Sequence, residues 1–208
     1  MIRFVISSSS QPEVPEIKME CENFLHQYEH RKNLYNVIYS LSEDESSVFR
    51  SRHEEFVKSM LLVTLDNNPI IRTTVAGKIF AELLYKNILS MEAITKGIDA
   101  VLKNWNDYLM DNPQFFSYIA AIIAPLLLSQ NASFDFNNLK DSCTSIRPDN
   151  SSKFFMEVLN KILRSNKTQK IKEHQGGILW IYNKWGMSDV SLDVFMPHNQ
   201  INKFFKND

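Results

Sequence analysis

Apolar residues recur at helical spacing through most of residues 56–128, and this pattern constrains the fold more than any other feature of the chain. They step by three and four residues, which lays one apolar stripe along each of three successive helices. The stripes are Met60, Leu61 and Leu65, then Ile71, Val75, Ile79 and Leu83, then Ile94, Ile98, Leu102, Trp105 and Leu109. From Tyr118 to Leu128 the chain is apolar on all sides, so neighbouring elements must bury that helix.

Further helices are predicted on both sides of this segment. They cover residues 16–29 and 33–41 before it, and 149–163, 178–185 and 197–205 after it, while the first of the three striped helices covers residues 51–65. No stretch alternates as a strand does, and the chain has only 5 glycines. The sequence therefore predicts an all-α fold of stacked antiparallel helix pairs, a HEAT-like helical repeat. We expect one such domain over residues 16–206, behind a flexible lead at 1–15.

Three start signals divide the central helices. Pro69 follows a polar triplet and suits the first position of a helix, where its missing N–H costs nothing. Ser90 is a suitable cap for one helix carrying Ile94 to Leu109. Asn112 followed by Pro113 gives the same start signal for the apolar helix.

Composition narrows the function classes. The 208 residues carry a net charge of −1, which argues against a general nucleic-acid binder. Charge is uneven, at −4 over 1–56, −1 over 57–150 and +4 over 151–208. Cys21 and Cys143 are expected to be free buried thiols in a reducing compartment, so we expect a cytoplasmic protein. The longest apolar run has 11 residues, from Tyr118 to Leu128, too short to span a bilayer.

Catalytic and metal-binding motifs are nearly absent. There is no Gly-rich phosphate loop, Gly-x-Ser-x-Gly, Cys-x-x-Cys or His-Glu-x-x-His, so we expect no enzymatic activity and no cofactor. His26 and His30 stand four apart and share a helix face. A zinc site needs two further ligands, for which Glu22 and Glu29 are the nearest candidates. The preferred interpretation is a solvated polar helix face with no metal.

A basic stretch at residues 161–172 is the second candidate site. Its members are Lys161, Arg164, Lys167, Lys170 and Lys172. They could contact RNA phosphates, but no exposed aromatic residues are interleaved for base stacking. A solvated face is the simpler interpretation, and weak RNA contact is the alternative.

Asp107 and Asp111 lie four residues apart and therefore share one helix face. In a helix that runs to about Leu109, they stand at the C-terminal end, where acids oppose the helix dipole. A carboxylate that is unfavourable for its own helix is expected to serve a role outside that helix. The alternative is that Asp111 helps to cap the next helix. Trp105 and Trp180 lie on apolar stripes and are expected to pack in the core.

Several segments, in order and spacing, resemble the MA-three domain of translation initiation factor 4 gamma, which also occurs in programmed cell death protein 4. The matching segments are Phe56-Val57-Lys58 through Leu65-Asp66-Asn67, Leu83-Leu84 through Ile88-Leu89-Ser90, Asp111-Asn112-Pro113, Tyr118-Ile119-Ala120, Pro125-Leu126-Leu127, Gly177-Ile178-Leu179-Trp180 and Phe195-Met196-Pro197. The resemblance covers about Glu16 to Phe205.

The resemblance implies a stacked helix-pair fold without catalytic activity. It implies binding to the DEAD-box RNA helicase initiation factor 4A, and so a role in cap-dependent translation with other initiation factors. In the family, paired acids before an aspartate-x-proline break meet basic residues of the helicase, and Asp107 and Asp111 stand at those positions. Asn112, Pro113 and Asn67 complete the partner-binding set that the resemblance implies.

The chain also departs from the family pattern. The acid run is thinned to two residues, with Asn106 and Leu109 at flanking positions, and Ala121 replaces an acid. Three alternatives to helicase binding therefore remain. They are a paralogue that has lost helicase binding, a helical RNA-binding module that uses residues 161–172, and a scaffold segment that docks another domain.

Overall fold

The computed structural model describes residues 15–31, 33–43, 52–66, 69–129 and 133–165, and within these ranges every regular element is a helix. The helices are α1 (Pro15–Arg31), α2 (Leu34–Glu43), α4 (His53–Asp66), α5 (Pro69–Tyr85), α6 (Met91–Leu102), α7 (Trp105–Asp111), α8 (Phe115–Leu128), α9 (Phe136–Asp141) and α10 (Pro148–Arg164). The predicted all-α class is confirmed. None of these helices is long and apolar enough to cross a membrane.

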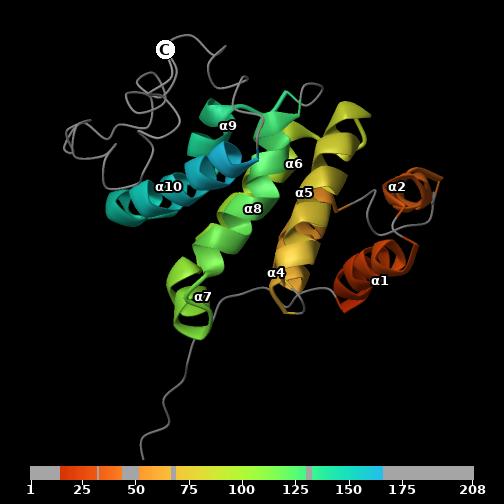
Figure 1. The fold of residues 1–208 in the computed structure, drawn as a ribbon, viewed down its shortest axis with the longest axis horizontal. Coiled ribbons are helices and arrows are strands. Elements are labelled where there is room, and N and C mark those ends of the chain that lie inside the picture. Colours follow the sequence, from red (N-terminus) through yellow and green to blue (C-terminus); the bar gives the residue numbers. More distant parts are fainter. Residues whose placement is uncertain (1–14, 32, 44–51, 67–68, 130–132, 166–208) are drawn as a thin grey trace, which may run out of the picture.

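The helices form a row in which each packs on its neighbours, with α1 and α2 at one end and α10 at the other (Figure 1). In this row α1 packs on α4, α4 on α5 and α6, α5 on α8, and α8 on α10. Because α4 and α5 pack together on either side of a two-residue link, they run antiparallel. This is the stacked-pair arrangement that the sequence predicts.

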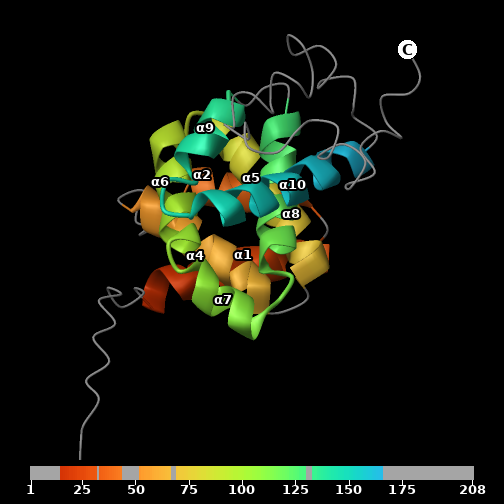
Figure 2. The ribbon, with the colours of Figure 1, turned by 90° about the vertical axis from the view of Figure 1, so that its left-hand side faces the viewer.

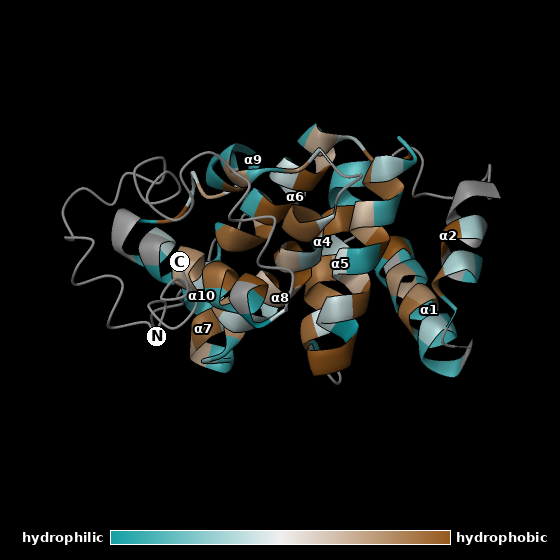
Figure 3. Ribbon diagram, turned by 45° about the horizontal axis from the view of Figure 1, so that its top comes forward, coloured by the Kyte–Doolittle hydropathy of each residue, from teal (hydrophilic) through white to brown (hydrophobic). Residues whose placement is uncertain are grey.

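The apolar helix lies at the centre of the core. α8 is packed between α5 and α10, and Ile119, Ile122 and Ile123 are fully buried. Hydrophobic residues are most concentrated in α8, while α1 carries more hydrophilic residues (Figure 3). Burial of α8 on several sides explains why it lacks a polar face.

Two glycines allow the central helices to approach closely. A Cβ added at Gly77 of α5 would lie 2.3 Å from the Ile122 carbonyl oxygen of α8 and 2.9 Å from Pro125 Cγ. A Cβ at Gly97 of α6 would lie 2.5 Å from Val57 Cγ1 of α4. The α5–α8 and α4–α6 contacts therefore depend on the absence of a side chain at these positions.

Two of the three predicted start signals, Pro69 and Ser90, are confirmed. The structure adds a cap at the start of α2, where Asn33 Oδ1 accepts hydrogen bonds from the N–H groups of Tyr35 and Asn36. Pro69 is the first residue of α5, as predicted. Ser90 caps α6 by accepting from the Ala93 N–H at 3.1 Å. At the end of α5, Asn87 has φ 55°, a left-handed conformation that asparagine tolerates and that terminates helices.

The predicted single helix through Leu109 is wrong. It divides into α6 and α7 at Lys103 and Asn104, where the Asn104 N–H bonds the Val101 carbonyl in a tighter turn. Asn104 leaves the helical region at φ −104°, ψ 23°. Asparagine is a weak helix former, and the break allows Trp105 to stack on α8, which offsets the lost helical hydrogen bonds.

Three smaller expectations also need correction. The apolar helix begins at Phe115 rather than at Pro113. Ile71, placed on an apolar stripe, is 43% exposed. α9 was missed, although Asp135 and Asn138 form a capping box at its start. The predicted helices at 178–185 and 197–205, Trp180 and the lead at 1–15 lie outside the described residues, apart from Pro15, which begins α1.

Candidate functional site

The candidate site is the hairpin formed by α7 and the start of α8, along the lower edge of the helical row in the views of Figures 1 and 2. Trp105 stacks on Phe116 with ring centroids 6.1 Å apart, and Tyr108 stacks on Phe115 at 5.2 Å. Phe115 is fully buried, so these stacks attach α7 to the core. Trp105 is only half-buried, which partly meets the expectation that it packs in the core.

The turn between the two helices is held by backbone hydrogen bonds. The Asn112 N–H donates to the Tyr108 carbonyl at 2.8 Å, and the Asn112 carbonyl accepts from the Phe115 N–H at 2.9 Å. Asn112 Oδ1 also accepts from the Gln114 N–H at 3.0 Å. Asn112 therefore ends α7 and shapes the turn, instead of directly capping α8 as predicted. Pro113 lies exposed within the turn.

Both candidate carboxylates lie on the exposed face of α7. Asp107 and Asp111 are exposed, and neither makes an ion pair with any residue that the structure describes. Met110, between them in sequence, is 78% exposed. The face combines two carboxylates and one flexible apolar side chain, a combination that suits a basic protein surface.

Asp107 does not oppose a helix dipole, so the prediction for this residue is wrong. Because α7 is a separate helix beginning at Trp105, Asp107 lies in its first turn, where a carboxylate is favourable. Asp111 is the last residue of α7, so for this residue alone the carboxylate opposes the helix dipole. For Asp111 alone, the unfavourable position at a helix C-terminus still indicates a role outside the helix.

Asn67, the fifth predicted partner-binding residue, lies outside the described residues. Its neighbours Asp66 and Pro69 end α4 and begin α5. Asp66 pairs with Lys18 of α1 at 3.5 Å. Of the five predicted residues, the four that the structure describes, Asp107, Asp111, Asn112 and Pro113, lie together in α7 and the turn after it.

The basic stretch at 161–172 is described only as far as residue 165. Lys161 is half-buried and Arg164 exposed, and both lie in the last turn of α10. Cations there stabilise the helix by interacting with its dipole, so these two residues have a structural explanation. Lys167, Lys170 and Lys172 lie outside the described residues.

The cysteines are free and buried, as predicted. Burial raises the pKa of the Cys143 thiol well above its ordinary range, and the nearby Asp99 carboxylate raises it further. The thiol therefore stays protonated, and a protonated thiol is a poor nucleophile.

A surface depression of about 340 Å³ lies between α4, α6 and α9, and no sequence motif pointed to it. Glu54, Lys96, Asp99, Lys103 and Asp141 line it with mixed charge. Asp99 accepts hydrogen bonds from the Ser145 N–H and hydroxyl at 3.0 and 2.9 Å, which fastens α6 to the chain after α9. Asp99 therefore has a structural role.

No protein-family model matches this chain, and no curated protein matches it in sequence.

Proposed function

We propose that this chain is a helical docking module that binds the DEAD-box RNA helicase initiation factor 4A through α7 and the turn after it. In this proposal it has no enzymatic activity and modulates cap-dependent translation in the cytoplasm. The observation that carries the proposal is the pair of exposed carboxylates, Asp107 and Asp111, on a helix whose opposite side is stacked on the core.

The rigidity of the hairpin supports a docking role. The stacks of Trp105 and Tyr108 on α8 and the hydrogen bonds of Asn112 hold α7 before any partner arrives. Pro113 restricts the turn further. A preorganised surface loses little conformational entropy on binding, so more of the contact energy appears as affinity.

Charge gives the surface its selectivity. Two carboxylates without ion-pair partners in the described part of the chain can both pair with basic residues of a helicase. Removing one partner of an interface charge pair typically costs about 2 kcal/mol or more. Met110 adds an exposed apolar side chain beside them, which can enter a shallow pocket.

The test is binding of purified initiation factor 4A to the wild-type chain and to Asp107→Lys/Asp111→Lys. The reversal removes both attractions and adds repulsion, so affinity should fall well over tenfold. The dipole effects at Asp107 and Asp111 have opposite signs, at about 0.3–1 kcal/mol each, so the thermal midpoint should hardly move.

A matched control reverses two exposed acids away from α7. Glu55→Lys/Asp141→Lys makes the same change in net charge, at the first turn of α4 and the end of α9. This control should bind like wild type. No binding by the wild-type chain would indicate a paralogue that has lost the helicase, and equal binding by a folded reversal variant would favour the scaffold-docking alternative.

A further inference from the structure

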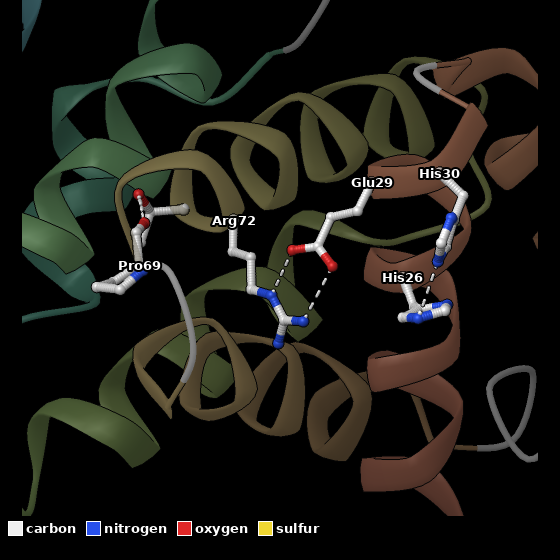
Figure 4. Close-up of polar contacts among 6 residues, drawn as sticks. His26, Glu29, His30, Pro69 and Arg72 are labelled. Atoms are coloured by element: carbon white, nitrogen blue, oxygen red, sulfur yellow. Dashed lines mark hydrogen bonds and ion pairs between the residues drawn. The ribbon is translucent and has the colours of Figure 1, made fainter.

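Two histidine side chains on α1 converge on one point. His26 Nε2 and His30 Nε2 lie 3.1 Å apart, and the ring centroids lie 4.3 Å apart (Figure 4). Both side chains are exposed, so solvent and dissolved ions reach them. One ring donates its Nε2 proton to the other when no cation is present. Transfer of that proton to Nδ1 of the same ring, by way of solvent, leaves the Nε2 lone pairs of both neutral rings available for one metal ion.

The separation of the two nitrogens fits a shared metal ion. Metal–imidazole bonds of about 2.0–2.1 Å combined with this separation give an angle of about 98° at the metal. That angle lies between the right angle of square-planar and octahedral complexes and the tetrahedral angle of about 109°, so it accommodates several late transition metals. With only two protein ligands, the metals that bind nitrogen most tightly in square-planar or tetragonal geometry, copper(II) and nickel(II), are favoured.

Glu29, one of the two carboxylates considered as a further ligand, is already paired. Glu29 Oε1 accepts from Arg72 Nε at 2.8 Å, and Glu29 Oε2 accepts from Arg72 Nη2 at 3.1 Å (Figure 4). In the described part of the chain, no group of three or more histidine, cysteine, aspartate or glutamate residues is arranged around a metal position. Among the described residues, the two histidines are therefore the only ligands that we assign, and water can take the other coordination positions.

We propose that His26 and His30 form a two-ligand site for an exchangeable late transition-metal ion of the copper(II) or nickel(II) type. It differs from the four-ligand zinc site considered for the sequence, because Glu29 takes no part in it. The charge on α1 favours a cation only weakly, since its four glutamates, Glu16, Glu20, Glu22 and Glu29, outnumber its two basic residues but Arg72 of α5 neutralises Glu29. A metal ion that joins residues four apart also holds two turns of α1 in helical geometry, so binding should stabilise the helix.

Calorimetric titration of the full chain, without a histidine tag, with nickel chloride tests the proposal. We expect binding of one nickel ion per chain, and His26→Gln and His30→Gln should each weaken that binding at least tenfold. His53→Gln is the matched control, because it removes a histidine from a different helix, α4, and it should bind nickel within twofold of wild type.

A thermal melt supplies the second measurement. Nickel should raise the midpoint of the wild-type chain and of His53→Gln, and should not raise that of either α1 variant. Both α1 side chains are exposed, so these variants should fold. Nickel binding that survives in both variants would overturn the assignment and would place the ion elsewhere, for example at His174 or His198. Absence of binding by the wild-type chain would overturn it equally.

Discussion

Gly77→Ala sets two physical effects against each other at the centre of the fold. Alanine is the better helix former by about 1 kcal/mol in a helix interior, so propensity alone predicts a more stable protein. The new Cβ would, however, lie 2.3 Å from the Ile122 carbonyl oxygen, and a backbone atom cannot rotate away. Overpacking of this kind costs up to about 3 kcal/mol, because α5 and α8 must separate.

The clash should outweigh propensity and leave a net loss of about 2 kcal/mol. For a chain of this size that loss lowers the thermal midpoint by about 4–8 °C. Urea denaturation followed by circular dichroism measures the free energy directly. Thr74→Ala is the control, because Thr74 is exposed on the same helix and its replacement should change stability by less than about 0.5 kcal/mol. A Gly77→Ala protein as stable as wild type, or more stable, would refute the close α5–α8 contact.

Three further predictions concern stability. Ile123→Ala should cost about 2–5 kcal/mol, since the side chain is fully buried in α8; a loss in urea unfolding under about 1 kcal/mol would place the helix at the surface. Arg72→Lys should cost about 1–2 kcal/mol, because lysine cannot make the two-point contact with Glu29, and Glu29→Gln in the Arg72→Lys background should then add little. Burial lowers the pKa of His53 from 6.5, so its contribution to stability is present above that pH and is lost as pH falls through the lower folded-state pKa; His53→Gln should therefore flatten the pH dependence of unfolding, and an unchanged dependence would contradict this assignment.

Local sequence signals were sufficient for much of the fold. The three-and-four spacing in α4, α5 and α6, and the helix starts at Pro69 and Ser90, depend on interactions within one or two turns of the same helix. The all-round apolar character of α8 likewise predicted its burial between two other helices. These predictions are confirmed because tertiary packing favours the same helices as the local sequence does.

The predictions of helix boundaries failed where tertiary contacts determine the local structure. Periodicity continued through Asn104 to Leu109, but stacking of Trp105 and Tyr108 on α8 favours a break and a separate α7. That break moved Asp107 from the end of one helix to the first turn of another, so its relation to the dipole was reversed. The short helix α9 is held by the capping box of Asp135 and by packing on α6, a signal too local to appear as periodicity.

For the candidate site, the sequence singled out residues that lie close together, but it did not predict how their side chains are arranged. Asp111, Asn112 and Pro113 were singled out by their order in the chain, and the structure places them in one turn. The exposed Met110 was missed, because nothing in the spacing distinguishes an outward methionine from a buried one. The close approach of the His26 and His30 rings on α1 could not be predicted either, since sequence spacing does not fix side-chain rotamers.

The central claim is that the two α7 carboxylates bind a basic surface of initiation factor 4A by charge. Its most direct test is the dissociation constant as a function of salt concentration, for the wild-type chain and for Asp107→Asn/Asp111→Asn. Asparagine keeps the size and removes the charge. Wild-type binding should weaken steeply with salt, while the variant should bind at least tenfold more weakly at low salt and respond little to salt. Equal affinities and equal salt dependence in the two proteins would contradict the claim.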